Sequence, residues 1–362
     1  MSFTDVTPVK WWKEATGYQV YPASFKDTNG DGIGDLNGVT EALDYLKLLG
    51  VDFIWLSPVY DSPGHDVGYD VRDYEKIWSR YGNMDDMDRL IAKAKSRGLR
   101  ILMDLVINHT SHEHRWFQES KKSKTNAFRD WYIWRDPKYT PSGERKPPCN
   151  WQGVFGGSTW TYVPDREQYY LHLSLPEQPD LNWENSEMRK AVYASAVEFW
   201  LAKGIDGFRV DMVNAYWKEP TFPDAPVLIP GSELQPMKLE YVINGPKVHE
   251  WLHEERTQVL DRFSQDIVTI GELPATEQEE VLKYVSASRR ELDATIDFNI
   301  FIAGNHWSVK MHDMKMHTLP ELKDAVSKTQ GLLYGTDAWT TAFLVSINAL
   351  DLSHWLIIVG ES

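Results

Sequence analysis

The strongest constraint on the fold is a repeated order of apolar strand and amphipathic helix. Strands are expected at 17–25, 51–57, 100–107, 205–212, 267–272, 294–300 and 339–344. Helices are expected among them at 38–49, 84–96, 187–203, 248–263 and 319–329. Alternation of this kind predicts parallel strands joined by helical crossovers, and therefore an α/β fold.

The alternation is interrupted by a segment rich in Trp, Gly and Pro between residues 111 and 185. We interpret it as a subdomain inserted after the third strand. The predicted organisation is a first part of a barrel at 1–110, the inserted subdomain at 111–185, a second part of the barrel at 186–344 and an aberrant tail at 345–362.

The fourth expected strand carries charged residues in an apolar setting, in the sequence GFRVDMVN from Gly207 to Asn214. Arg209 and Asp211 are two positions apart, so they share one face of a strand. Ionised groups at the end of an apolar strand are costly unless they are paired or used. These eight residues alone leave two readings open, a structural Arg–carboxylate pair and an active centre.

Polar residues also end the neighbouring strands. Asp104, Asn108 and His109 end the third strand, and Glu272 ends the fifth. In a (β/α)8 barrel the carboxyl ends of the strands form the catalytic face. The sequence therefore favours a TIM barrel with these residues at one rim.

Two carboxyl groups about 5 Å apart are what retaining glycoside hydrolysis requires. Arg209 is expected to keep Asp211 ionised, whereas the apolar neighbours of Glu272 are expected to raise its pKa. Asn108 and His109 offer donors for sugar hydroxyls, although a histidine standing alone in such a place is more often a satisfied core residue.

Charge and cysteine content narrow the choice of partner. The net charge of −15 argues against nucleic acid or an anionic membrane, so a neutral or cationic ligand is expected. Cys149 is the single cysteine, which excludes an internal disulfide and favours a reducing compartment. With no apolar leader or membrane-length apolar run in the sequence, we expect a soluble, cytoplasmic protein.

Several ordered motifs resemble the signatures of the α-amylase family of glycoside hydrolases. They are DLVINHTS at 104–111, QPDLN at 178–182, GFRVDMVN and TIGE at 269–272. QPDLN is similar to the oligo-1,6-glucosidase and α-glucosidase (maltase) branch, and DSPGHDVGYDVRDY, NWQGVFGGSTW and NGPKVHEWL look like fungal maltases in particular. The resemblance extends from about Lys10 to Leu344.

This resemblance implies an α-glucosidase that removes terminal glucose from maltose and short oligosaccharides, with retention through a glucosyl-enzyme intermediate. It implies Asp211 as nucleophile and Glu272 as general acid/base. The implied substrate-binding residues are Asp66 and Tyr69 at the pocket floor, His109, Arg209 and, as a wall, Phe155. Ser174 replaces an expected aromatic residue, and Met212 does not decide between α-1,4 and α-1,6 preference.

The loop DTNGDGIGD places oxygen-bearing side chains at alternate positions and permits a tight wrap. This pattern suits a hard cation, although an Asp/Asn/Gly turn without metal has the same composition. The family resemblance implies structural calcium or magnesium here and no organic cofactor. The expected ligands are Asp27, Asn29, Asp31, the carbonyl of Ile33, and Asp35. His109, His112 and His114 lack the spacing of a zinc site.

The chain departs from the family pattern after Leu344. Ser346, Ile347 and Asn348 replace the family's Asn, His and Asp, and Asp351 follows three residues late. We expect an incomplete barrel of about seven strands with an open edge, no C-terminal β-domain, and weak or no activity. The alternatives are a non-catalytic binding or scaffold protein and a relative that transfers glucose or isomerises sucrose.

Overall fold

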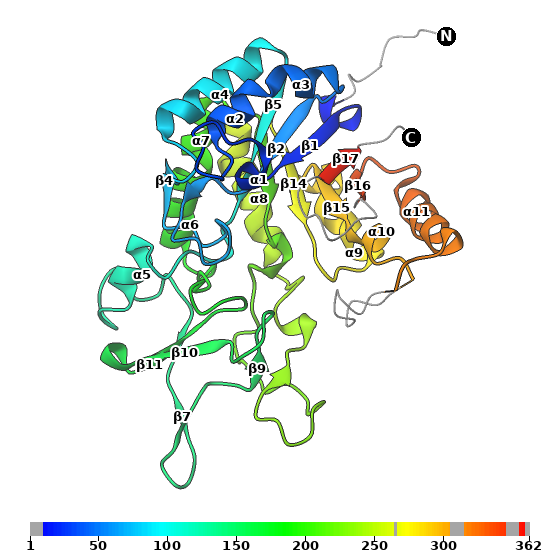
Figure 1. Cartoon of the computed structure of the whole chain (residues 1–362). Helices are drawn as coiled ribbons and strands as arrows, with labels where there is room; N and C mark the ends of the chain where they lie inside the picture. Colours follow the sequence, from blue (N-terminus) through cyan, green and yellow to red (C-terminus); the bar gives the residue numbers. More distant parts are fainter. Residues whose placement is uncertain (1–9, 264–265, 305–314, 345–354, 359–362) are drawn as a thin grey trace.

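The computed structural model describes residues 10–263, 266–304, 315–344 and 355–358, and its centre is a barrel of strands (Figure 1). Seven strands are parallel and neighbour one another in chain order. They are β1 (Thr16–Val20), β2 (Phe53–Leu56), β5 (Arg100–Leu105), β12 (Gly207–Val210), β14 (Val268–Glu272), β15 (Ala294–Asp297) and β16 (Thr340–Leu344). The predicted α/β barrel with seven parallel strands is confirmed.

The barrel is an incomplete (β/α)8 fold with seven parallel strands, as expected, but its edge is not open, because an eighth strand closes the sheet. The strand β17 (Trp355–Ile358) pairs antiparallel with both β1 and β16. It hydrogen-bonds the backbone groups that an open edge would leave unpaired. The pairing uses backbone atoms, so the absence of a family motif in this segment did not prevent it.

Helices connect the strands around the outside of the barrel (Figure 1). They are α1 (Pro22–Phe25), α2 (Leu36–Glu41), α3 (Leu43–Leu48), α4 (Met84–Ser96), α5 (Arg115–Ser120), α6 (Ser186–Val192), α7 (Phe199–Lys203), α8 (Val248–Gln258), α9 (Gln278–Val285), α10 (Phe298–Phe301) and α11 (Leu319–Leu333). A π-helical segment, Tyr193–Glu198, joins α6 to α7. Short 3-10 turns occur at 11–13, 164–166, 213–215, 239–241, 260–262 and 287–289.

Local chemistry explains where several elements begin and end. The helix α4 has the predicted bounds, and a reciprocal capping box between Asn83 and Asp86 starts it. The predicted strand at 17–25 is shorter because Pro22 opens α1. The predicted strand at 294–300 ends at Asp297, whose side chain caps α10.

Small sheets lie outside the barrel, and those containing β7, β9, β10 and β11 extend away from it (Figure 1). The strands β6 (Trp134–Arg135), β10 (Trp160–Val163) and β11 (Gln168–Leu171) form one sheet. Two-stranded sheets pair β9 (Trp151–Gln152) with β13 (Gln235–Pro236), β7 (Lys138–Tyr139) with β8 (Arg145–Lys146), and β3 (Tyr60–Asp61) with β4 (Asp73–Ile77). Because β13 contacts β9, the segment after β12 also contributes to this region, and the domain bounds stay a prediction.

The barrel interior is apolar below its polar rim. Its buried residues include Phe53, Trp55, Leu102, Val268 and Ile270, and a larger apolar cluster fills the space between strands and helices. Gly207 begins β12 at a φ of 150°, and a Cβ there would lie 1.9 Å from the carbonyl oxygen of Val268. The glycine therefore permits the close approach of β12 and β14 that brings their ends together.

Candidate active site

Three neighbouring strands bring four charged groups together at the carboxyl end of the barrel. Arg209 donates from Nη1 to Asp104 Oδ1 at 2.7 Å and to Asp211 Oδ1 at 2.7 Å. Its Nη2 lies 2.8 Å from Glu272 Oε1. We call Arg209, Asp104, Asp211 and Glu272 the Arg209 cluster. Arg209, Asp104 and Asp211 are almost entirely removed from solvent, and the Glu272 side chain is 18% exposed.

The chain turns sharply directly after Asp211. Met212 has φ 41° and ψ 40°, a left-handed conformation that is uncommon for a residue other than glycine. This turn directs the Met212 amide toward Glu272, and it donates to Oε2 at 3.0 Å. Strain of this kind persists where the surroundings hold it, and it is concentrated at functional sites.

Burial raises the pKa of Asp211 to about 6, against the opposing effect of Arg209. Burial also raises the pKa of Glu272. The interaction between the two groups lowers the pKa of Asp211 and raises that of Glu272, so it favours the proton on Glu272. The expected rise for Glu272 is thus present, but Arg209 does not keep the pKa of Asp211 low, because one buried guanidinium is shared among three carboxyl groups.

A second buried cation lies beside this cluster. Lys218 contacts Asp180 Oδ2 at 2.7 Å and donates to Asn108 Oδ1 at 2.7 Å, and we call these three residues the Lys218 cluster. Burial lowers the pKa of Lys218, and Asp180 opposes that shift. Sequence reasoning missed Lys218; the available signal was a lysine among apolar and aromatic residues in the segment AYWKEP.

The Lys218 cluster positions His109. Asn108 Nδ2 donates to His109 Nδ1 at 3.2 Å, and His109 Nε2 lies 3.0 Å from the carbonyl oxygen of Tyr69. These partners place the ring proton on Nε2, because a carbonyl only accepts. Burial lowers the pKa of His109, so the ring is neutral.

The expected floor residues Asp66 and Tyr69 belong to the same network. Gln178 Nε2 donates to Asp66 Oδ2 at 2.9 Å and to the carbonyl oxygen of Tyr69 at 3.3 Å. The Tyr69 hydroxyl donates to Asp104 Oδ2 at 3.1 Å. The structure therefore joins Asp66, Tyr69 and His109 to the Arg209 cluster, and Gln178 is the connecting residue that was not singled out.

Phe155 lies on the turn between β9 and β10 and exposes 62% of its surface. The preceding residue, Val154, donates its amide to the carbonyl oxygen of Leu173 at 2.8 Å. Phe155 is thus a rim residue rather than a buried wall in this structure. Ser174 is buried, and its carbonyl oxygen contacts the ring of His172.

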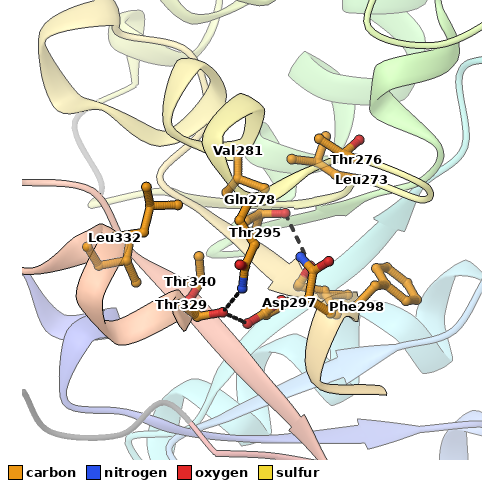
Figure 2. Close-up of a pocket in the computed structure, with 13 residues that line it drawn as sticks. Leu273, Thr276, Gln278, Val281, Thr295, Asp297, Phe298, Thr329, Leu332 and Thr340 are labelled. Carbon is orange, nitrogen blue, oxygen red and sulfur yellow. Dashed lines mark hydrogen bonds between the residues drawn. The ribbon is translucent and has the colours of Figure 1, made fainter. Parts of the chain in front are cut away.

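The carboxylate that ends β15 has a structural role. Figure 2 shows Thr329 between Gln278 and Asp297 in a pocket where α9, α10 and α11 meet. Gln278 donates to the Thr329 hydroxyl at 2.7 Å, which donates to Asp297 Oδ2 at 2.6 Å. The other oxygen of Asp297 accepts the amide of Asn299. Both oxygens are therefore engaged by the protein.

The candidate cation loop follows α1, and its oxygens accept amides of the loop itself. Asp27 accepts from the amides of Asn29, Gly30 and Gly32. Asn29 accepts from Asp31, Asp31 accepts from Ile33, and Asp35 caps α2 while also accepting from Thr28. Each carboxylate offers about four lone-pair positions, so Asp27 and Asp31 retain free ones. An all-oxygen set with spare lone pairs fits calcium or magnesium.

The structure gives His114 a role that needs no metal, and the replaced family motif after Leu344 is not described. His114 Nδ1 accepts the amide of Trp116 at the start of α5, and burial lowers the pKa of His114 to about 3. Ser346, Ile347, Asn348 and Asp351 lie outside the described residues. Among the helices that the structure describes, none combines the length and apolar character of a membrane span.

Comparisons with known proteins agree on one family. Residues 19–348 match the alpha amylase catalytic domain. The chain is 49% identical over 335 residues to an α-glucosidase of Candida albicans and 45% identical over 341 residues to an oligo-1,6-glucosidase of Saccharomyces cerevisiae. The two matches include 92% and 93% of this chain, respectively. The chain spans only 58% of the length of each relative. A solved isomaltulose synthase of Protaminobacter rubrum has a TM-score of 0.83 at 42% identity, over 91% of this chain and 57% of that one.

Proposed function

The chain belongs to the alpha-amylase family, and on that premise we propose that it is an α-glucosidase acting on terminal glucose of maltose and short oligosaccharides. The observation that carries the proposal is the placement of Asp211 and Glu272 on either side of Arg209, which contacts Asp211 at 2.7 Å and Glu272 at 2.8 Å, with the pKa of both carboxyl groups raised by burial. Their interaction favours the proton on Glu272, which is the protonation pattern that a nucleophile and a general acid require.

In the first step an oxygen of Asp211 attacks the anomeric carbon of the terminal glucose. The bond from that carbon to the leaving oxygen breaks as Glu272 gives its proton to this oxygen, which leaves a glucosyl ester on Asp211. In the second step Glu272 takes a proton from water, whose oxygen attacks the anomeric carbon and releases Asp211. Two inversions retain the anomeric configuration.

The remaining residues bind and orient the sugar in this proposal. Asp66 and Tyr69 form the floor for the non-reducing end. His109 binds a sugar hydroxyl when its Nε2–H turns from the carbonyl oxygen of Tyr69 to the sugar. Arg209 stabilises Asp211 as the leaving carboxylate. Hydrolysis is expected to be slow, because Ser346, Ile347 and Asn348 replace the family's Asn, His and Asp, and this Asp is the family's third catalytic carboxylate. Loss of transition-state contacts lowers rates by orders of magnitude.

The test is hydrolysis of maltose and isomaltose by the purified chain, with the anomer of the released glucose followed by NMR at early times. The α-anomer should appear first, at a low rate that Asp211→Asn abolishes. Initial release of the β-anomer, or a rate unaffected by Asp211→Asn, would contradict the proposal. The ratio of the two rates reports the linkage preference.

A second candidate is the isomerisation of sucrose, which the similarity to a solved isomaltulose synthase favours. Its first step uses the same Asp211 and Glu272 chemistry, and the glucosyl group then passes to another hydroxyl of the retained fructose. Product analysis with sucrose separates the two functions. Isomaltulose as the main product supports isomerisation, and glucose with fructose supports hydrolysis.

Calcium or magnesium in the loop of Asp27, Asn29 and Asp31, with the carbonyl of Ile33 and Asp35, would be structural in this proposal, fastening the loop after α1. Added Ca²⁺ should raise the melting temperature of metal-depleted protein, and Asp31→Ala should remove the effect.

A cytoplasmic location also belongs to the proposal, supported by the single cysteine; cell fractionation tests it.

A further inference from the structure

Two loops beside the candidate active site bring three metal-ligating side chains together. One loop follows β3 and carries His65, and the other follows β5 and carries His112 and Glu113. One ligand atom from each of these residues lies within 4.8 Å of the others. The two imidazole rings have centroids 5.5 Å apart and are inclined at 43°, so they do not stack face to face.

The loop that carries His65 is fixed by a buried carboxylate. Asp70 accepts the His65 amide at Oδ2 at 3.0 Å and the Asp66 amide at Oδ1 at 3.2 Å. Its Oδ1 also accepts the hydroxyl of Ser62 at 2.8 Å. The position of the His65 backbone is therefore set by the protein itself.

The loop that carries the other two ligands is fixed in the same way. The His112 amide donates to the carbonyl oxygen of Glu177 at 2.7 Å, and the His112 carbonyl accepts from Gln118 Nε2 at 2.6 Å. The Glu113 amide donates to the hydroxyl of Ser111 at 3.1 Å. Because the backbone of the ligand residues is already held in place without a metal ion, binding an ion costs less conformational entropy.

The side chains keep enough freedom to close on an ion. Zinc–nitrogen bonds are about 2.0–2.1 Å, so ligand atoms around one ion lie within about 4 Å of each other. The three ligand atoms now lie within 4.8 Å of one another, so they must move closer together to bind one ion. His65 and Glu113 are exposed and His112 is half-buried, which leaves their side chains room to rotate. A water molecule supplies the fourth position of such a site.

Neighbouring charge does not remove Glu113 from this role. Arg72 makes a bidentate pair with Asp61, at 2.7 and 2.8 Å, and reaches Glu113 Oε2 with its remaining nitrogen at 3.1 Å. Asp61 already compensates the charge of Arg72. The other oxygen of Glu113 is available to a cation.

We infer that His65, His112 and Glu113 form a binding site for zinc or a similar divalent transition metal ion. Two imidazoles and one carboxylate are the ligands that zinc prefers over calcium and magnesium. Of the three histidines whose spacing argued against zinc, only His112 belongs to this set, and its partners His65 and Glu113 come from the fold rather than from that spacing. His109 is held by Asn108 and Tyr69, and His114 caps α5. Because His65 precedes Asp66, the ion ties together the two loops that carry Asp66 and His109.

The test is calorimetric titration of the metal-depleted full chain with ZnCl₂, repeated with a variant carrying His65→Asn and His112→Asn. The wild type should bind one equivalent more than this variant, and Glu113→Gln should weaken that binding by about tenfold or more. His253→Asn is the matched control, because His253 is an exposed histidine on α8 that contacts a backbone carbonyl. Comparing variants removes the contribution of zinc bound elsewhere.

Equal zinc binding by the wild type and the double variant would overturn the inference. Displacement of the zinc by excess Ca²⁺ would also overturn it, because Ca²⁺ binds oxygen ligands rather than imidazoles. Circular dichroism of the double variant establishes that it is folded. Cobalt offers an independent measurement in the wild type, since Co²⁺ in a four-coordinate site with nitrogen ligands absorbs strongly in the visible range. Neither readout depends on glucosidase activity.

Discussion

The two buried cations near the barrel rim have very different surroundings. Arg209 faces three carboxyl groups, whereas Lys218 faces one carboxyl group and one amide oxygen. The Lys218 cluster is close to neutral when both ions are charged. The Arg209 cluster carries more carboxyl groups than one cation can compensate, so it holds a proton. A surplus of buried acid favours proton transfer, and a balanced pair favours fixed geometry.

The largest effect should come from the surplus side of this comparison. Asp211→Asn removes the proposed nucleophile, so glucose release should fall by at least about a thousandfold. The free energy of unfolding should hold or rise, because the change removes a group whose ionised form burial disfavours. Paired activity and urea-denaturation measurements check this; a strongly destabilised Asp211→Asn would mean that the Arg209 cluster is primarily structural.

The same substitution in the balanced cluster should have the opposite profile. Asp180→Asn leaves the charge of Lys218 buried without its carboxylate, which should cost about 3–5 kcal/mol of unfolding free energy. The control is Asp130→Asn, whose partner Arg129 is on the surface, and it should cost less than about 1 kcal/mol. If both substitutions cost the same in urea denaturation, the distinction between the clusters fails.

The pH dependence sharpens the comparison further. Hydrolysis requires ionised Asp211, so kcat/KM should fall as the pH drops through about 6, and a raised pKa of Glu272 should set the alkaline limb. For stability the sign is reversed. The pKa of Asp211 in the folded protein lies above its ordinary value. The protonated Asp211 therefore stabilises the folded state fully below pH 4, and this stabilisation is lost as the pH rises through about 6.

Measurement of kcat/KM and of unfolding free energy from pH 4 to 8 checks both signs. The variant Glu272→Gln should lose the alkaline limb, and Asp211→Asn should lose the part of the stability change centred near 6. An acid limb close to 4 would show that Arg209 keeps Asp211 ionised after all.

The smallest effect concerns the loop that connects the two clusters. Val67 has a φ of 43°, which is strained for a β-branched residue, and it follows Asp66 directly. Val67→Asn should therefore raise the unfolding free energy by about 1 kcal/mol. Thermal unfolding measures this gain. The control is Val154, an exposed valine that is not in the left-handed region, and Val154→Asn should give no gain in the same measurement.

Sequence periodicity predicted the seven parallel strands and the shared rim of Asp104, Asp211 and Glu272, because strand ends in a parallel barrel must meet. It did not predict how Arg209 divides its hydrogen bonds, which depends on side-chain placement rather than on spacing. Lys218 was missed because its partner Asn108 is 110 positions away in the chain. The π-helical segment at 193–198 has no glycine or proline to mark it.

The strand β17 was also missed, although WLII is a run of apolar and β-branched residues. It lies where the sequence departs from the family pattern, so the motifs carry no information about this strand, whereas its residue types do. Backbone pairing can complete a sheet with any compatible segment, so motif loss predicts lost chemistry better than it predicts lost architecture.

The antiparallel closure by β17 has a consequence for folding kinetics. It pairs Thr16 with Ile358, so these barrel contacts join residues that are far apart in the sequence. Loop-closure entropy grows only slowly with length, but contacts of large sequence separation form late and slowly. Because β17 follows the seven parallel strands in the chain, the edges of β1 and β16 stay available to other chains until β17 docks between them.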